Sequence, residues 1–189
     1  MNIEPTLLQA CRKNDRKAQF QLYESCFSLL MSVCVRYKRD RNDAKAILNQ
    51  GFLKILTNLD KYDEKIPFGA WIHRIMVNTI IDEYRKYKKE NELTQYADFT
   101  VHNSFDNRVD FNLADQMFDA EEVEYFIKQL PPMTLQVFNL SEIDGYSHKE
   151  IAKMLNIAEG TSKWHLSNAR KKLKALIAEA IEKEQIESQ

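Results

Sequence analysis

The side chains best suited to binding a charged ligand lie between Gly160 and Lys174, where the chain has cations and no carboxylate. Cations gathered in this way can neutralise nucleic-acid phosphates and release their counterions, which makes binding depend on salt. The alternative is a solvated amphipathic helix whose cations complement the negative C-terminal end of the helix dipole. The cations are Lys163, Arg170, Lys171, Lys172 and Lys174.

Two predicted helices position these cations. Ser147 and Glu150 form a capping box that opens the first helix, and Asn156 ends it. The second begins at Glu159 and has a predicted buried stripe of Ser162, Leu166, Ala169 and Leu173. Its opposite face carries Lys163, Trp164, Ser167, Asn168 and Lys171. Two short helices around a tight turn predict a helix-turn-helix whose second helix could enter a DNA major groove.

The family resemblance begins in this segment. The helix-turn-helix of bacterial sigma factors, especially the extracytoplasmic-function group, resembles the residues GYSHKEIAKMLNIAEGTSKWHLSNARKKL. Response regulators carry related motifs, and Ala158 stands where the family usually has a capping serine. The resemblance implies that Lys163, Trp164, Ser167 and Asn168 lie nearest base edges. It also implies that Thr161, Arg170 and Lys171 lie nearer phosphates. For Trp164, burial against the preceding helices is the alternative.

Composition predicts an all-α fold. Hydrophobic residues make up 44% of the 189 residues and charged residues 29%, which is typical of a globular protein. Four glycines and four prolines favour long helices. Cys11, Cys26 and Cys34 lack metal-ligand spacing and are expected to be buried free thiols. No signal peptide or membrane-spanning segment is expected, so we predict a cytoplasmic protein.

Charge divides the chain into three parts. Residues 1–89 carry 17 Lys/Arg against 10 Asp/Glu, residues 90–130 carry 2 against 10, and residues 131–189 carry 8 of each. We therefore expect two small helical domains, 1–89 and 119–189, joined by a flexible acidic linker at 90–118. In the second domain, Asp119 should open a helix that Pro131 and Pro132 end, and a further helix should run to Gly145.

The first domain should contain three long helices. Asp15 is expected to cap a helix from Arg16 to about Lys38, and Asn42 a helix from Asp43 to about Leu59. After a loop, a third helix should begin at Phe68 and end near Lys89. The sigma-factor domain that binds polymerase and the minus-ten promoter element resembles the segment from Arg41 to Lys86 in this region.

The second resemblance implies two further sites. One is a minus-ten DNA site, in which Tyr62 could instead be a structural loop residue. The other faces the β′ clamp of RNA polymerase. The family usually has several carboxylates there, but here Lys45 follows Asp43-Ala44 and Gly51 interrupts the helix, so the affinity for core polymerase could be altered. The minus-ten residues are Lys61, Tyr62, Lys65, Arg74 and Asn78. The polymerase-binding residues are Asp43, Ile47, Asn49, Gln50, Phe52 and Leu53.

Catalytic and cofactor patterns are not found. The four glycines are scattered, and neither the four histidines nor the cysteines have metal-ligand spacing. We interpret His73 and His148 as surface or rim residues and place His165 near phosphates or beside the recognition face. We expect a non-enzyme without cofactor or metal. The resemblance implies an alternative sigma factor with three partners: core RNA polymerase, promoter DNA and an anti-sigma factor. The alternatives are a free-standing helix-turn-helix regulator and a sigma-like polymerase-interaction protein without initiation activity.

Overall fold

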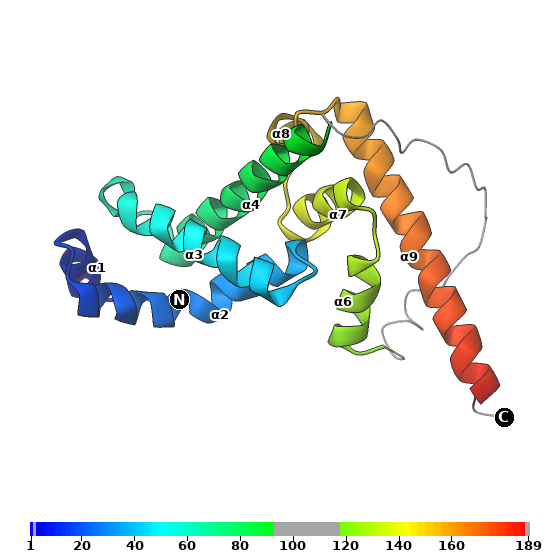
Figure 1. Ribbon diagram of the computed structural model, residues 1–189, viewed down its shortest axis with the longest axis horizontal. Helices are drawn as coiled ribbons and strands as arrows, with labels where there is room; N and C mark the ends of the chain where they lie inside the picture. Colours follow the sequence, from blue (N-terminus) through cyan, green and yellow to red (C-terminus); the bar gives the residue numbers. More distant parts are fainter. Residues whose placement is uncertain (2, 93–117, 188–189) are drawn as a thin grey trace. The chain divides into compact units, whose positions relative to one another are not determined.

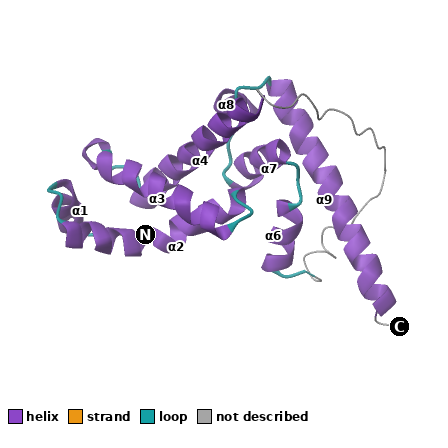
Figure 2. Ribbon diagram, in the orientation of Figure 1, coloured by secondary structure: helices purple, strands orange, loops and turns teal. Residues whose placement is uncertain are grey.

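The chain folds into helices in every part that the structure describes. The computed structural model describes residue 1, residues 3–92 and residues 118–187, and within these ranges no strand is present (Figure 2). Contacts divide the chain into two compact units, residues 1–90 and 91–189. The all-α fold class is confirmed. Most of the predicted acidic linker lies outside the described residues, and in the described part no helix is long and apolar enough to cross a membrane.

The first unit is a bundle of helices in which α2 packs against both α1 and α3 (Figure 1). Its core is aliphatic, with Leu22, Leu30, Ile47, Ile55 and Ile72 essentially inaccessible to solvent. Burying side chains of this size supplies most of the stability of such a unit. The elements are α1 (Pro5–Arg12), α2 (Arg16–Tyr37), α3 (Arg41–Thr57), the 3-10 turn η1 (Leu59–Lys61) and α4 (Phe68–Glu92).

Helix caps decide where these helices begin. The Asp15 carboxylate accepts hydrogen bonds from the backbone N–H groups of Lys17 and Ala18, so the predicted start of α2 is confirmed. The predicted cap and first residue of α3 were wrong. Asp40 caps this helix by accepting from the N–H groups at positions 42 and 43, and Asn42 lies inside the first turn. The helix therefore starts two residues earlier than expected and ends at Thr57.

The sequence patterns did not predict α1. Pro5 occupies the first turn, where its missing N–H costs nothing, and Leu8 and Cys11 are buried. Asn14 then adopts a left-handed conformation (φ 61°), which turns the chain into α2. The helix is only eight residues long, with two buried side chains three positions apart, so its periodic signal is weak.

The three cysteines lie within this unit as buried free thiols, as predicted. Burial raises the pKa of Cys26 and of Cys34 to about 12, because a thiolate would lose its hydration there. Burial, and then the charge of Asp15, also raises the pKa of Cys11. These thiols therefore stay protonated near neutral pH and act as small apolar side chains.

The second unit contains the helix-turn-helix. Asp119 opens α6, as expected, and its side chain forms a capping box with Glu122 that was not predicted. The segment after α7 closes in a π-helical turn, a wider turn that the sequence did not predict, before Gly145 (φ 75°) leads into α8. The elements are α6 (Ala120–Lys128), α7 (Pro132–Phe138), η2 (Asn139–Ile143), α8 (His148–Leu155) and α9 (Glu159–Glu187).

Close packing between α3 and α4 explains the glycine inside α3. A Cβ atom at Gly51 would lie 2.4 Å from the Cε and 2.7 Å from the Sδ of Met76, which is itself fully buried. Any larger residue must displace this thioether within a packed interior. Glycine therefore allows the two helices to approach each other, although it costs about 1 kcal/mol of helix propensity.

We expect Gly51→Ala to lower the free energy of unfolding by about 1 kcal/mol, because the displacement of Met76 outweighs the gain in helix propensity. Chemical denaturation of the full chain would measure it. Gly69→Ala is the matched control within α4, since a Cβ atom at Gly69 would have Leu29 Cδ2 as its nearest neighbour, at an ordinary 3.7 Å. In a Met76→Ala background the sign should reverse, and an equal loss in both backgrounds would contradict this explanation.

Candidate nucleic-acid interface

The turn between α8 and α9 has the geometry of a helix-turn-helix. The Ser147 N–H donates to Glu150 Oε2 at 2.9 Å, and the Glu150 N–H donates to Ser147 Oγ at 3.3 Å, so the predicted capping box is confirmed. Asn156 ends α8 in a left-handed conformation (φ 53°). The N–H of Ile157 then closes the turn onto the Ala152 carbonyl at 3.0 Å. These local bonds fix the angle at which α9 leaves the turn.

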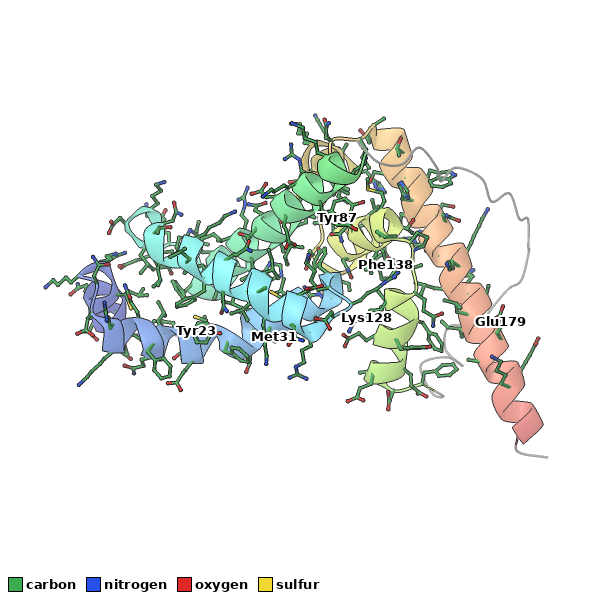
Figure 3. The ribbon with its side chains drawn as sticks, viewed as in Figure 1. Tyr23, Met31, Tyr87, Lys128, Phe138 and Glu179 are labelled. Atoms are coloured by element: carbon green, nitrogen blue, oxygen red, sulfur yellow. The ribbon has the colours of Figure 1, made fainter. Side chains whose placement is uncertain are left out.

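One face of α9 is buried, as predicted. Ser162 and Ala169 are inaccessible to solvent, and Leu166 and Leu173 are buried. The small side chains let α9 approach α7 and α8, and the two leucines fill the space beside them. Ala169 and Leu173 form a buried cluster with Leu130 and Leu135, and Phe126, Ile127 and Phe138 pack against it (Figure 3 labels Phe138 on α7).

Burial of this stripe leaves the predicted DNA-contacting residues on the outer face. Lys163, Trp164, Ser167, Arg170 and Lys171 are exposed, whereas Thr161 and Asn168 are half-buried. The Trp164 side chain is 51% exposed, so burial beneath the preceding helices, the alternative weighed from sequence, is excluded in this structure. A large aromatic ring left in solvent at the centre of a basic face is available to a partner.

Carboxylates pair with two of these cations. Lys163 Nζ lies 2.7 Å from Glu159 Oε1 one turn earlier, and the pKa of Glu159 is lowered by its hydrogen bond with Lys163 and then by the charge of that lysine. Arg170 donates to Glu142 of η2 at 3.0 Å. Glu142 lies 28 residues away in the sequence. The segment from Gly160 to Lys174 has no carboxylate of its own, but carboxylates from outside it compensate two of its cations.

His165 does not take the place predicted for it near phosphates or beside the recognition face. The side chain is buried, and its Nδ1 lies 3.0 Å from the Thr134 hydroxyl of α7. A buried polar group of this kind is stable only when it is hydrogen-bonded. The Thr134–His165 pair therefore fixes α9 against α7 and supports the exposed face without belonging to it.

The structure adds His148 to the candidate nucleic-acid interface. The sequence pattern had indicated only a surface or rim residue at this position. Its Nδ1 lies 2.9 Å from Ser162 Oγ, which joins the start of α8 to the buried stripe of α9. The same ring lines a hollow of about 280 Å³. The other lining residues are Lys163, Leu166, Ser167, Arg170, Lys171 and Lys174, all on α9. The cations around this hollow suit an anionic group. The position of His148 at the start of the first helix of the motif was the sequence signal that could have indicated its place beside these cations.

The predicted minus-ten residues lie around one end of α4 in the first unit. Tyr62 packs against Phe68 and Trp71, with ring centroids 5.1 and 5.0 Å away, and its hydroxyl donates to the Ile66 carbonyl at 2.7 Å. Partial burial, and then the charges of Glu64 and Asp63, raises the pKa of Tyr62. Tyr62 therefore shapes the loop. The side chains of Lys61, Lys65, Arg74 and Asn78 are exposed.

The predicted polymerase-binding residues of α3 divide into two groups. Asp43, Asn49, Gln50 and Leu53 are exposed, and Leu53 is 62% accessible. Ile47 and Phe52 are buried in the core, where Phe52 meets Tyr23 edge-to-face at 5.0 Å (Figure 3 labels Tyr23 on α2). These two side chains hold the helix in place and do not face a partner, because burial keeps them from its surface.

Comparison with known proteins identifies the family. The models for Sigma-70 region 2 and Sigma-70, region 4 match residues 22–90 and 120–173, together more than half of the chain. The ECF RNA polymerase sigma factor SigW of Bacillus subtilis is 24% identical over 177 residues, covering 88% of this chain and 92% of that protein. SigM of the same organism is 25% identical, covering 82% and 93%. The chain belongs to the sigma-70 family, as an extracytoplasmic-function sigma factor.

A solved structure is also similar. It is the sigma factor RpoE in complex with the anti-sigma factor NepR from Bartonella quintana, 16% identical, with a TM-score of 0.49, and the match covers 84% of this chain and 97% of that one.

Membership of the sigma-70 family identifies the general function of this chain. Sigma factors are DNA-binding proteins of transcription initiation, and the chain is an alternative sigma factor of that class. Each predicted site residue lies inside one of the two matched ranges. The helix α1 and the part of α9 after Leu173 lie outside both. In the described part of the chain no group of three His, Cys, Asp or Glu side chains could hold a metal ion.

The Thr134–His165 contact predicts which neighbouring substitutions affect stability. His165→Ala removes the partner of a buried hydroxyl, so the second unit should lose about 2 kcal/mol of unfolding free energy. Trp164→Ala, one residue earlier but exposed, should change it by less than about 0.5 kcal/mol. Denaturation of the full chain, followed by circular dichroism, would compare them. Equal losses for both variants would show that His165 has no special structural role.

Proposed function

We propose that this sigma factor directs core RNA polymerase to promoters that it reads at two elements. The observation that carries the proposal is the exposed face of α9, where Lys163, Trp164 and Ser167 stand above a fully packed stripe. A rigid helix that presents cationic and polar groups in this manner suits the DNA major groove. The proposal includes action in the cytoplasm, where the polymerase is, without catalytic activity, metal or cofactor of its own.

The second unit would read the minus-35 element. Lys163, Ser167 and Asn168 offer donors and acceptors to base edges, and the exposed indole of Trp164 offers an apolar surface to a thymine methyl group. Thr161, Arg170 and Lys171 would contact phosphates and set the register. His148 joins this set in our proposal because it lines the same hollow as three of these cations.

The first unit would open and hold the minus-ten element. Lys61 and Lys65 of the loop, with Arg74 and Asn78 on the exposed side of α4, would contact the displaced single strand. The Tyr62 ring would support the loop from the side of α4, since it already packs on Phe68 and Trp71. This division of roles follows from exposure and departs from the direct contact that the resemblance implied for Tyr62.

Core polymerase would dock on the exposed side of α3. Asp43, Gln50 and Leu53 fall at spacings of seven and three, which places them on one side of the helix, with Asn49 beside them. Ile47 and Phe52 would support this side from beneath. The face has one carboxylate where the family resemblance implies several, so we expect a slower encounter with the clamp and an apolar contact at Leu53 that carries much of the affinity.

The proposed organisation comprises a domain at 1–89, an acidic linker at 90–118 and a domain at 119–189. An anti-sigma factor that covers a polymerase- or DNA-binding face is a further partner that the family resemblance implies. Two other functions are the alternatives to this proposal. One is a free-standing helix-turn-helix regulator, and the other is a polymerase-interaction protein that does not open promoters.

Reconstituted transcription tests promoter reading. Purified chain and core RNA polymerase from the same organism should yield mapped start sites on genomic fragments. Replacing both Lys163 and Trp164 with Ala should reduce these transcripts by about 100-fold, because two base contacts worth about 1–3 kcal/mol each are lost. Lys183→Ala, a cation near the end of α9, is the control. Core binding without any start site would favour the interaction protein, and the absence of core binding would favour the free-standing regulator.

The proposed docking surface predicts that one substitution weakens the binding of core polymerase and that another strengthens it. Leu53→Ala should weaken core binding about tenfold, since it removes a large exposed apolar contact. Lys45→Glu should strengthen it, mainly through a faster association rate that declines with salt. Surface plasmon resonance on immobilised core would measure both rates. If both variants bind as the unaltered chain does, the exposed side of α3 is not the docking surface.

A further inference from the structure

The helix α1 is an integral part of the first unit although neither sigma-70 model includes it. It packs against α2 and the turn η1, with Leu8 and Cys11 buried. The turn after it is fixed as well, because the Asp15 N–H donates to the Ala10 carbonyl at 3.1 Å and the Gln19 side chain donates to the Cys11 carbonyl at 3.4 Å. A segment held in this way can position its neighbours.

Arg12, the last residue of α1, contacts the turn η1 that follows α3. Its Nη2 and Nε both donate to the backbone carbonyl of Leu59, at 3.1 and 3.3 Å, and Nε lies 3.7 Å from Asp60 Oδ1. Leu59 is buried, whereas the Asp60 side chain is 86% exposed. The carbonyl contact is therefore the stronger of the two, since an exposed ion pair at this distance contributes little.

The Leu59 carbonyl also binds the start of the minus-ten loop. The backbone N–H of Tyr62 donates to the same oxygen at 3.2 Å, so one carbonyl joins the guanidinium of Arg12 to the backbone of Tyr62. A cation here also faces the carbonyl end of a helical turn, where the dipole favours positive charge. Arg12 thus holds the place at which the chain leaves η1 and enters the loop.

The far side of this loop is fixed by different contacts. The Tyr62 hydroxyl donates to the Ile66 carbonyl, and the Lys65 N–H donates to Asp63 Oδ1 at 3.0 Å. The ring of Tyr62 lies against Phe68 and Trp71 of α4. Within the loop these bonds are local, and the contact from Arg12 comes from a helix 47 residues away in the sequence. Arg12 therefore adds a hydrogen bond from α1 to the burial of Leu59 and the packing of Tyr62 that hold this loop.

We infer that Arg12 is a positioning residue for the capture of single-stranded minus-ten DNA. It does not touch the DNA; it fixes the loop that presents Lys61 and Lys65 to the strand. The inference rests on the proposed function of this loop. It assigns a role in promoter opening to α1, which lies outside the matched part of the sigma-70 fold.

The test compares three binding steps of the full chain. Holoenzyme is assembled with core polymerase, and its affinity is measured by fluorescence anisotropy for a single-stranded oligonucleotide carrying the minus-ten strand of a promoter mapped by transcription. Core affinity and binding to a minus-35 duplex are measured in parallel. Arg12→Ala should weaken single-strand binding about tenfold and leave the other two within about twofold.

Two variants serve as controls for charge and geometry. Lys13→Ala removes the same charge one residue later from an exposed side chain, and it should bind the single strand as the unaltered chain does. Arg12→Lys keeps the charge but loses the planar fork that reaches the Leu59 carbonyl with two nitrogens, so its loss should be intermediate. This variant also provides the comparison if Arg12→Ala does not fold.

The outcomes separate the two proposals. If the unaltered holoenzyme binds the strand and both Arg12 variants bind it equally well, the inference about Arg12 is wrong and the function of the loop stands. If Lys13→Ala loses as much affinity as Arg12→Ala, charge and not position is responsible, which also overturns the inference. If the unaltered holoenzyme fails to bind the strand, the proposed function of the loop fails and the inference with it.

Discussion

The burial of one stripe of α9 is the constraint on which the second unit depends. Ser162 and Ala169 are inaccessible to solvent because α9 packs closely against α7 and α8. The opposite side of α9 therefore faces solvent. Two buried or half-buried polar pairs, Ser162 with His148 and His165 with Thr134, prevent the helix from rotating about its axis. A rotation would leave these groups without partners, at a cost of about 1–3 kcal/mol each. The proposed reading of DNA by the exposed face would require this fixed rotation.

The same face is electrostatically compensated before DNA arrives. Lys163 and Arg170 each pair with a carboxylate, so in the proposed complex a base edge would replace Glu159 as the partner of Lys163, and a phosphate would replace Glu142 as the partner of Arg170. Exposed ion pairs contribute about 0–1 kcal/mol, so the exchange costs little, whereas releasing counterions from DNA is strongly favourable at low salt. In the proposed complex these carboxylates would weaken non-specific attraction more than they oppose a well-fitted site, because only well-placed DNA groups recover the lost hydrogen bonds.

In the first unit, tight packing replaces polar pairing as the positioning device. Gly51 lets Met76 lie against the backbone of α3, and Ile47 and Phe52 fill the adjacent core. The helix can then expose Asp43, Gln50 and Leu53 along one side. Buried and exposed residues alternate along this helix, so position in the sequence alone does not tell which of them would form the proposed polymerase face.

Separation along the chain explains which features could be predicted. The caps at Asp15, Asp119 and Ser147 and the α9 stripe involve residues two to four positions apart, and side-chain chemistry and periodicity predicted them. The bonds from Arg12 to Leu59, from Thr134 to His165 and from Arg170 to Glu142 span 47, 31 and 28 residues, and no sequence pattern predicted any of them. Local patterns specify which face a helix buries, but the partner of a charged or polar side chain is decided by tertiary packing. The sequence could therefore predict which face of α9 is exposed, whereas only the structure could tell that His165 supports this face and that Arg12 contacts the loop of the other unit.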